Sequence, residues 1–251
     1  MMTAFDWTAR CARAERQVAR ARAARNISPG WAHEAAEAAL LLAAAAHATG
    51  TVSEREAWLQ EATHWFERLI AAEQADPQGE ATVPVLDVEV ISRAILTAWA
   101  AGEFARAAAF GQLPASLFRP AQPRHPDPAA RATAFALASA ARDDQAAFAR
   151  ALANARTAIA RGKNVEPTAA RGYRVPLLDG LEAGFHQQPR QLERALERLL
   201  RFHRWRTRTA AMPLAALDLT SSGLVRWAAQ HGVLLTRSDP LLALPSAQAR
   251  R

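Results

Sequence analysis

Residues 95–107, ILTAWAAGEFARA, show the pattern that decides the fold: a helical run, a glycine turn and a second helical run. Ile95 and Trp99 are four residues apart, as on one face of a helix, and Gly102 follows as a turn signal. The same rhythm recurs around turn signals at Gly50, Asp143, Gln187 and Gly232. This self-similarity predicts an all-α, right-handed α-solenoid of about five helix-turn-helix pairs, in which each pair buries its apolar face on its neighbours.

Three helices are expected before residue 80. The first is expected from about Thr3 to Arg25, and Ser28 with Pro29 predicts the N-cap and first turn of the second, which ends near Thr49. Ser53, followed by Glu56, resembles a capping box and predicts the start of the third helix. Its apolar side comprises Trp58, Leu59, Ala62, Trp65, Phe66, Leu69 and Ile70, and it is expected to end at 76–79.

The rest of the chain also reads as helix pairs. Helices are expected at 85–101, on both sides of the Asp143–Asp144 turn, at 177–186, at 191–205 and at 214–230, with a loop at 162–172. Phe148, Leu152, Ala155 and Ile159 have helical spacing after the Asp143–Asp144 turn. Residues 233–235 and 241–244 are expected to form a short extended C-terminal cap, because terminal repeats need one.

The stretch 114–128 holds five of the 14 prolines and is expected to be a loop. The prediction is one α-helical repeat domain over 1–251, with a subdivision near this loop. In that case 1–113 would be the N-terminal helices, 129–245 the C-terminal repeats and 246–251 a disordered tail.

Charge and composition narrow the class of protein. The formal net charge is +7, and every basic residue except Lys163 is arginine. Heavy Arg and Ala usage is also what a GC-rich genome produces, so the charge alone does not predict nucleic-acid binding. No run approaches the roughly 20 apolar residues of a membrane span, and the N-terminus does not resemble a secretory signal. A cytoplasmic protein with no membrane or nucleic-acid partner is therefore expected.

No enzyme motif overlies the helices. Cys11 is the single cysteine, which excludes an internal disulfide and a cysteine-based zinc site. The seven histidines are scattered without metal-ligand spacing, and Ser221 lies in an expected helix rather than in a nucleophile elbow. No glycine-rich phosphate loop is present. The expectation is a protein with no enzymatic activity, no catalytic residues, no metal and no cofactor.

One stripe of the helix at 191–205 suggests a binding surface. Arg190, Arg194, Arg198, Arg201 and Arg208 share it with Trp205. Such a stripe could bind an acidic protein surface, or it could be a solvated face balanced by Glu193 and Glu197. Asp218 follows an apolar stretch and is expected either to reach an arginine of the preceding helix or to face a partner. Candidate partner-binding residues are Arg194, Arg198, Arg201, Trp205 and Asp218.

The C-terminal portion from about Tyr173 resembles the immunity 49 (Imm49) family of bacterial polymorphic-toxin immunity proteins. The resemblance lies in 176–183, PLLDGLEA, in 191–205, where a leucine ladder ends in His and an aromatic, in the small-residue helix and glycine turn of 212–233, and in Leu244-Pro245. It implies an immunity protein that binds and neutralises a cognate toxin of the same cell. It implies no catalytic residue.

Two further classes stay open. Gly102, Glu103, Phe104 and Ala107 look like the inter-helix turn of a tetratricopeptide-type repeat, which would fit a scaffold or adaptor that binds peptides. Such a groove would use residues such as Asn154 and Asn164. A nucleic-acid-binding helical repeat is the third class. The sequence leaves open the identity of the toxin and the oligomeric state. It also leaves open which half of the chain forms the interface. The C-terminal half is basic, whereas in the N-terminal half acidic residues outnumber arginines by eleven to two between Trp31 and Glu89.

Overall fold

The computed structural model describes residues 7–75, 85–122, 124–162, 164–208, 216–235 and 239–243, and all regular structure in these ranges is helical. The all-α prediction is therefore confirmed. The α-helices are α1 (Trp7–Ala23), α2 (Pro29–Ala48), α3 (Val52–Ala75), α4 (Val88–Ala101), α5 (Phe104–Gly111), α6 (Pro128–Ala141), α7 (Gln145–Arg161), α8 (Pro167–Ala169), α9 (Val175–Phe185), α10 (Pro189–Thr207) and α11 (Leu219–Gln230). A 3₁₀ turn, η1 (Ala115–Leu117), and a π-helical turn, η2 (Ala170–Arg174), complete the set.

The helix starts follow local capping chemistry. Ser28 caps α2, since its hydroxyl accepts from the Trp31 amide at 3.3 Å, as predicted. Asp87, Asp127 and Asp144 cap α4, α6 and α7 in the same way. The prediction that Ser53 caps α3 is wrong: α3 begins at Val52, because the Thr51 carbonyl already accepts the Arg55 amide at 3.0 Å.

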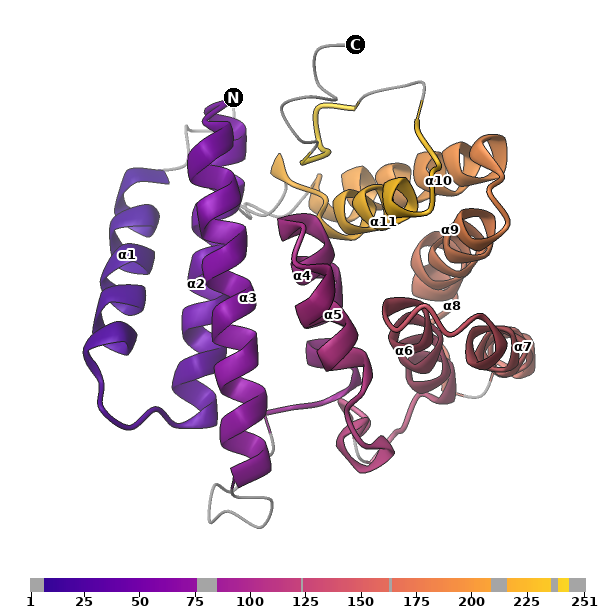
Figure 1. The fold of residues 1–251 in the computed structure, drawn as a ribbon, viewed down its shortest axis with the longest axis horizontal. Helices are drawn as coiled ribbons and strands as arrows, with labels where there is room; N and C mark the ends of the chain where they lie inside the picture. The colour runs from indigo at the N-terminus through magenta and orange to yellow at the C-terminus, as the bar shows by residue number, and fades with distance from the viewer. Residues whose placement is uncertain are drawn as a thin grey trace.

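Helices α1, α2 and α3 form a layer at one side of the molecule (Figure 1). Helix α2 is rich in alanine and lies between α1 and α3, so its small side chains let both neighbours approach closely. Six of the seven residues predicted for the apolar side of α3 are buried, and Trp58 is half-buried: the buried ones are Leu59, Ala62, Trp65, Phe66, Leu69 and Ile70. The predicted end of α3 at 76–79 and the start of the first helix at Thr3 lie outside the described residues.

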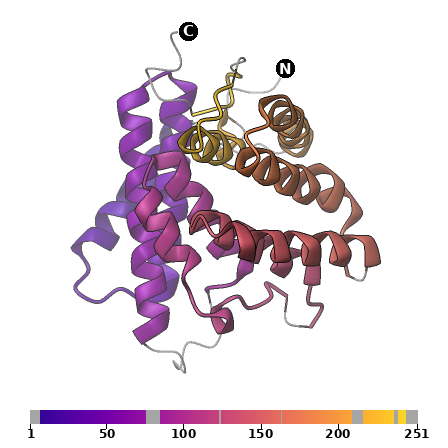
Figure 2. The ribbon, with the colours of Figure 1, turned by 45° about the vertical axis from the view of Figure 1, so that its right-hand side comes forward.

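Three antiparallel helix pairs follow the layer: α4 with α5, α6 with α7, and α9 with α10 (Figures 1 and 2). The last helix, α11, turns back and packs on α4. A Cβ on Gly223 would lie only 2.6 Å from the Leu96 carbonyl oxygen, so this glycine allows the two backbones to approach. Beside that contact, the rings of Trp99 and Trp227 stack with their centroids 5.3 Å apart.

The proline-rich stretch 114–128 is packed between helices. Leu117 and Phe118 are buried, and Phe118 stacks on Phe135 of α6 at 4.6 Å. The Arg119 carbonyl accepts from the Val88 amide at the start of α4. A single cluster of buried apolar side chains runs from Ala14 in α1 to Ala243 near the C-terminus.

The loop predicted at 162–172 is wrong for its second half. Glu166 caps α8, since its carboxylate accepts from the amides of Thr168 and Ala169. Elements α8, η2 and α9 then form one continuous stretch of helical backbone. The π-turn brings Gly172 against Phe202 of α10, where a Cβ would lie 2.2 Å from the ring. It also buries Arg174, whose guanidinium pairs with Asp127 at 2.6 Å. These tertiary contacts stabilise helical backbone that the sequence pattern alone does not indicate.

The final helix is shorter than predicted. It begins at Leu219 rather than Leu214, because Asp218 adopts an extended conformation and caps it. Pro213 and the range 209–215 lie outside the described residues. Residues 239–243 form a turn rather than the extended cap that the sequence predicts, and this turn packs on the start of α11: the Leu241 carbonyl accepts from the Asp218 amide at 2.9 Å, and the Ala243 amide donates to the Ser222 hydroxyl at 2.8 Å. Leu244-Pro245 lies outside the described residues.

Candidate interaction surfaces

Helix α10 presents one straight row of arginines around a tryptophan. Its inner side buries Leu192, Ala195, Leu196, Leu199 and Leu200, which fixes the opposite side toward solvent. The row, called here the α10 row, comprises Arg190, Arg194, Arg198, Arg201, Trp205 and Arg208, all exposed. Successive members are three or four residues apart and so share one face, and the row is roughly 27 Å long at about 1.5 Å per residue.

The predicted partner-binding residues of α10 all lie in this row. Within the described residues, Arg194 and Arg201 form no ion pair. Arg198 is partly neutralised, because its guanidinium donates to Asp179 of α9 at 3.0 Å and to the Arg171 carbonyl at 3.4 Å. The row therefore carries more positive charge at Arg194 and Arg201 than at Arg198.

Trp205 is exposed yet held in place. Its side chain is among the few large apolar ones on the surface, with the residue 47% exposed. Phe202 stacks on it with centroids 5.7 Å apart, and the Arg208 guanidinium lies 5.9 Å from the ring centroid. The Phe202 ring in turn lies beside that of Tyr173 in η2, with ring centroids 6.5 Å apart. A side chain ordered in this way loses little entropy when a partner binds it.

Asp218 does not belong to this surface. It is 4% exposed, and its carboxylate accepts from the Ser221 amide at 3.1 Å and the Ser221 hydroxyl at 2.6 Å. The expectation that it faces a partner is a wrong prediction, because burial removes it from contact with other molecules. Nor does it form an ion pair with an arginine among the residues described; its role is to cap α11.

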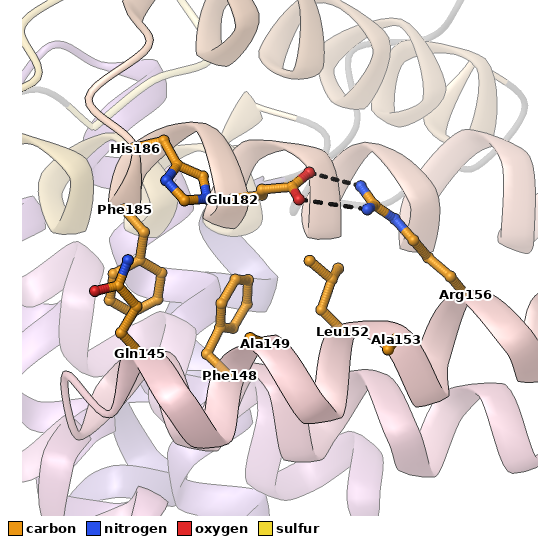
Figure 3. A pocket seen from close by; sticks show the side chains of 9 residues that line it. All are labelled: Gln145, Phe148, Ala149, Leu152, Ala153, Arg156, Glu182, Phe185 and His186. Carbon is orange, nitrogen blue, oxygen red and sulfur yellow. Dashed lines mark hydrogen bonds and ion pairs between the residues drawn. The ribbon is translucent and has the colours of Figure 1, made fainter.

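A groove of about 280 Å³ separates α7 from α9 (Figure 3). Its apolar side chains include Phe148, Leu152 and Phe185, and the rings of Phe148 and Phe185 lie 4.8 Å apart. Figure 3 shows Arg156 of α7 reaching across to Glu182 of α9, with a 2.7 Å contact. The same guanidinium lies 3.3 Å from Asp179, so one acidic residue of α9 is shared between Arg156 and the α10 row.

A second hollow, of about 270 Å³, lies between α6 and α7. Phe135 and three alanines line it together with Arg150 and Asn154. The other asparagine considered from the sequence, Asn164, is not there: its amide donates to the Pro126 carbonyl at 3.2 Å. Asn164 therefore ties two loops together.

The structure contains a polar cluster that the sequence did not predict. His47 of α2 lies between the Pro240 carbonyl, 2.6 Å from Nε2, and the Arg55 guanidinium, 3.3 Å from Nδ1. Arg55 is 5% exposed, and burial lowers its pKa. Next to it, Glu56 pairs with Arg226 of α11 at 3.3 Å, and Arg226 donates to the Ala100 carbonyl at 2.6 Å. Four distant segments thus meet here, and only tertiary structure brings them together.

The described residues hold no group of three His, Cys, Asp or Glu side chains placed to bind a metal ion. Cys11 is half-buried, and burial raises the pKa of its thiol, with Glu15 adding to the effect. Among the described helices, none combines the length and the apolar character needed to cross a membrane.

No family model, no curated protein and no solved structure matches this chain.

Proposed function

We propose that this protein is an immunity protein, which binds a cognate bacterial toxin and neutralises it through a protein–protein interface. The observation that carries the proposal is the α10 row, with its ordered and exposed Trp205 among arginines. Tryptophan and arginine are enriched among the residues that dominate binding energy at protein interfaces. The row also lies in the part of the sequence that resembles the immunity 49 family.

In this proposal the three helix pairs are tetratricopeptide-like repeats of a right-handed α-solenoid. Helix α11 takes the place of a terminal cap, since it follows the last pair in the chain and packs on α4 as well as on α9 and α10. A standard interface buries about 800 Å² on each partner, which a row roughly 27 Å long and its flanks can supply. The protein acts stoichiometrically, in the cytoplasm, by covering the toxin or holding it inactive, and it needs no cofactor or enzymatic activity.

The test is co-expression with the toxin encoded beside this gene. Cells that carry the toxin alone should stop growing, and cells that also carry this protein should grow. The purified pair should elute as a single complex of fixed stoichiometry. Growth arrest despite full expression of this protein, together with no complex between the purified proteins, would overturn the proposal.

The second candidate is a tetratricopeptide-like scaffold that binds peptides. The hollow between α6 and α7 favours it, because Arg150 and Asn154 line this hollow beside Phe135 and could hold the polar groups of a peptide. An array of acidic C-terminal peptides tests this function. Binding that is lost in the Arg150→Ala/Asn154→Ala variant but kept in a variant of the α10 row would favour the scaffold.

A further inference from the structure

We infer that the toxin surface that docks on the α10 row is acidic, with a recess for the exposed part of Trp205, and so is not the nucleic-acid-binding face of a nuclease. This inference rests on the proposed function and adds the chemistry of the partner. It depends on the charges along α10 and on how Trp205 is held.

The α10 row concentrates like charges on one face of a helix. Arg190, Arg194 and Arg198 succeed one another at intervals of four residues, and Arg201 follows three residues later. Like charges at this spacing repel each other and destabilise the helix. An acidic surface laid along the row would remove this repulsion and add charge-assisted hydrogen bonds to the guanidinium groups.

The fold neutralises only part of the row and its surroundings. Asp179 pairs with Arg198, and Asp239 pairs with Arg204 on the flank of α10. Arg194 and Arg201, which lie on either side of Arg198, have no ion pair within the described residues. Positive charge therefore stays available at two positions about 10 Å apart along the helix, within reach of carboxylates on one partner surface.

The surroundings of the row favour a protein over a nucleic acid. Glu193 and Glu197 lie on one flank of the row, and Asp179 with Glu182 of α9 lies beyond Arg198. A phosphate backbone carries a charge at every nucleotide and would need further basic groups beside the row, where these acidic residues stand instead. A narrow basic row between acids instead matches a few discrete carboxylates on a protein.

The positive charge of the α10 row limits which face of a toxin it can bind. An enzyme that cleaves nucleic acid binds its substrate through a positively charged face. Two positive faces repel each other, and like charges across an interface suppress association. A toxin held by the α10 row therefore presents an acidic face, which is either the rim of its own active site or a surface away from that site.

Charge reversal tests the inference, with a matched control on α1. The test variant is Arg194→Glu/Arg201→Glu, and the control is Arg13→Glu/Arg16→Glu, which removes exposed arginines of α1 and changes the net charge by the same amount. Association with the purified toxin is measured at several salt concentrations, and circular dichroism melting verifies that both variants fold. The test variant should associate at least about tenfold more slowly than wild type, and the control should stay within about threefold.

Further outcomes separate the inference from the proposed function. If wild type fails to bind the toxin, the proposed function falls, and the inference falls with it. If wild type binds and the test variant binds equally well, or if both variants lose binding equally, only the inference is overturned. A carboxylate-to-lysine change on the toxin that restores binding to the Arg194→Glu/Arg201→Glu variant would support it. Tight binding of a labelled 20-nucleotide single-stranded DNA that is lost in the same variant would overturn it in favour of a nucleic acid.

Discussion

The Nε2 of His47, near the end of α2, lies 2.6 Å from the Pro240 carbonyl oxygen, across 193 residues of chain. Its Nδ1 lies 3.3 Å from the Arg55 guanidinium. Because arginine only donates, Nδ1 must accept, and the proton of the neutral ring is on Nε2, where it donates to Pro240. Protonation of Nδ1 would remove the Arg55 contact, whereas the Nε2 bond to Pro240 would remain, so both contacts form together only while His47 is uncharged.

Stability should therefore fall at acidic pH. Burial lowers the pKa of His47, and the charge of Arg55 lowers it further, against the opposing effect of the Pro240 hydrogen bond. A histidine whose pKa is lower in the folded state contributes stability above its unfolded pKa of about 6.5, and the contribution is lost as the pH falls through the folded value. Urea unfolding between pH 8 and pH 5 measures this loss.

A glutamine at the same position supplies the control. In His47→Gln the amide can donate to Pro240 and accept from Arg55 without titrating, so the decline between pH 8 and pH 5 should be shallower than in wild type. His64→Gln, which changes an exposed histidine paired with Glu67, should leave the decline unchanged. Equal declines in wild type and His47→Gln would show that His47 does not cause the pH dependence.

Gly223→Ala should destabilise the protein by about 1–3 kcal/mol. The added Cβ would lie 2.6 Å from the Leu96 carbonyl oxygen, so α11 and α4 would have to move apart. Gly30→Ala is the control, because the nearest atom to its added Cβ is 4.0 Å away, and there alanine should be neutral or slightly stabilising. Thermal unfolding of the two variants gives the comparison; equal melting temperatures would contradict the close approach of α4 and α11.

Leu242→Ala should cost about 2–5 kcal/mol of unfolding free energy, although it lies in a short non-helical segment near the C-terminus. Leu242 is 6% exposed and packs in the main apolar cluster, so truncation leaves a cavity. Leu234→Ala, at a residue 59% exposed, should change stability by less than about 0.5 kcal/mol. Chemical denaturation distinguishes the two, and a negligible effect of Leu242→Ala would mean that 239–243 does not dock stably.

Asp218→Ala should destabilise α11 by about 1 kcal/mol, and Asp218→Asn should retain most of the capping. The carboxylate accepts from the Ser221 amide, and an asparagine side-chain oxygen can take the same bond. If Asp218 is only a cap, toxin affinity of the folded Asp218→Asn variant should equal that of wild type. A large loss of affinity at unchanged stability would instead return Asp218 to the binding surface.

The sequence predicted the helices best where the deciding chemistry is local. Ser28 with Pro29 fixes the start of α2, and Gly102, with φ of 81°, ends α4 at the predicted turn. The exposed row on α10 also follows from spacing alone, because residues three and four apart must share a helix face. Arg194, Arg198, Arg201 and Trp205 are all exposed as the stripe suggested.

The predictions failed where distant segments decide the conformation. The helical backbone through η2 depends on two contacts: Phe202 packs against Gly172, and Arg174 pairs with Asp127. In both contacts the partners are far apart in the sequence. Asp218 looked like a residue inside a helix because the apolar run before it has no obvious break, whereas the Leu241 carbonyl takes its amide. The contact between His47 and Pro240 has no local signal in either stretch.

The packing of α11 on α4 has a consequence for synthesis on the ribosome. Arg226 and the Ala100 carbonyl, which touch in the folded protein, are 126 residues apart. At roughly 5–20 residues per second, a nascent chain completes α4 several seconds to tens of seconds before α11 exists. During that interval the apolar face of α4 around Trp99 lacks its final cover. Packing of α4 is thus completed only after α11 has been synthesised, and until then this apolar face is open to a chaperone.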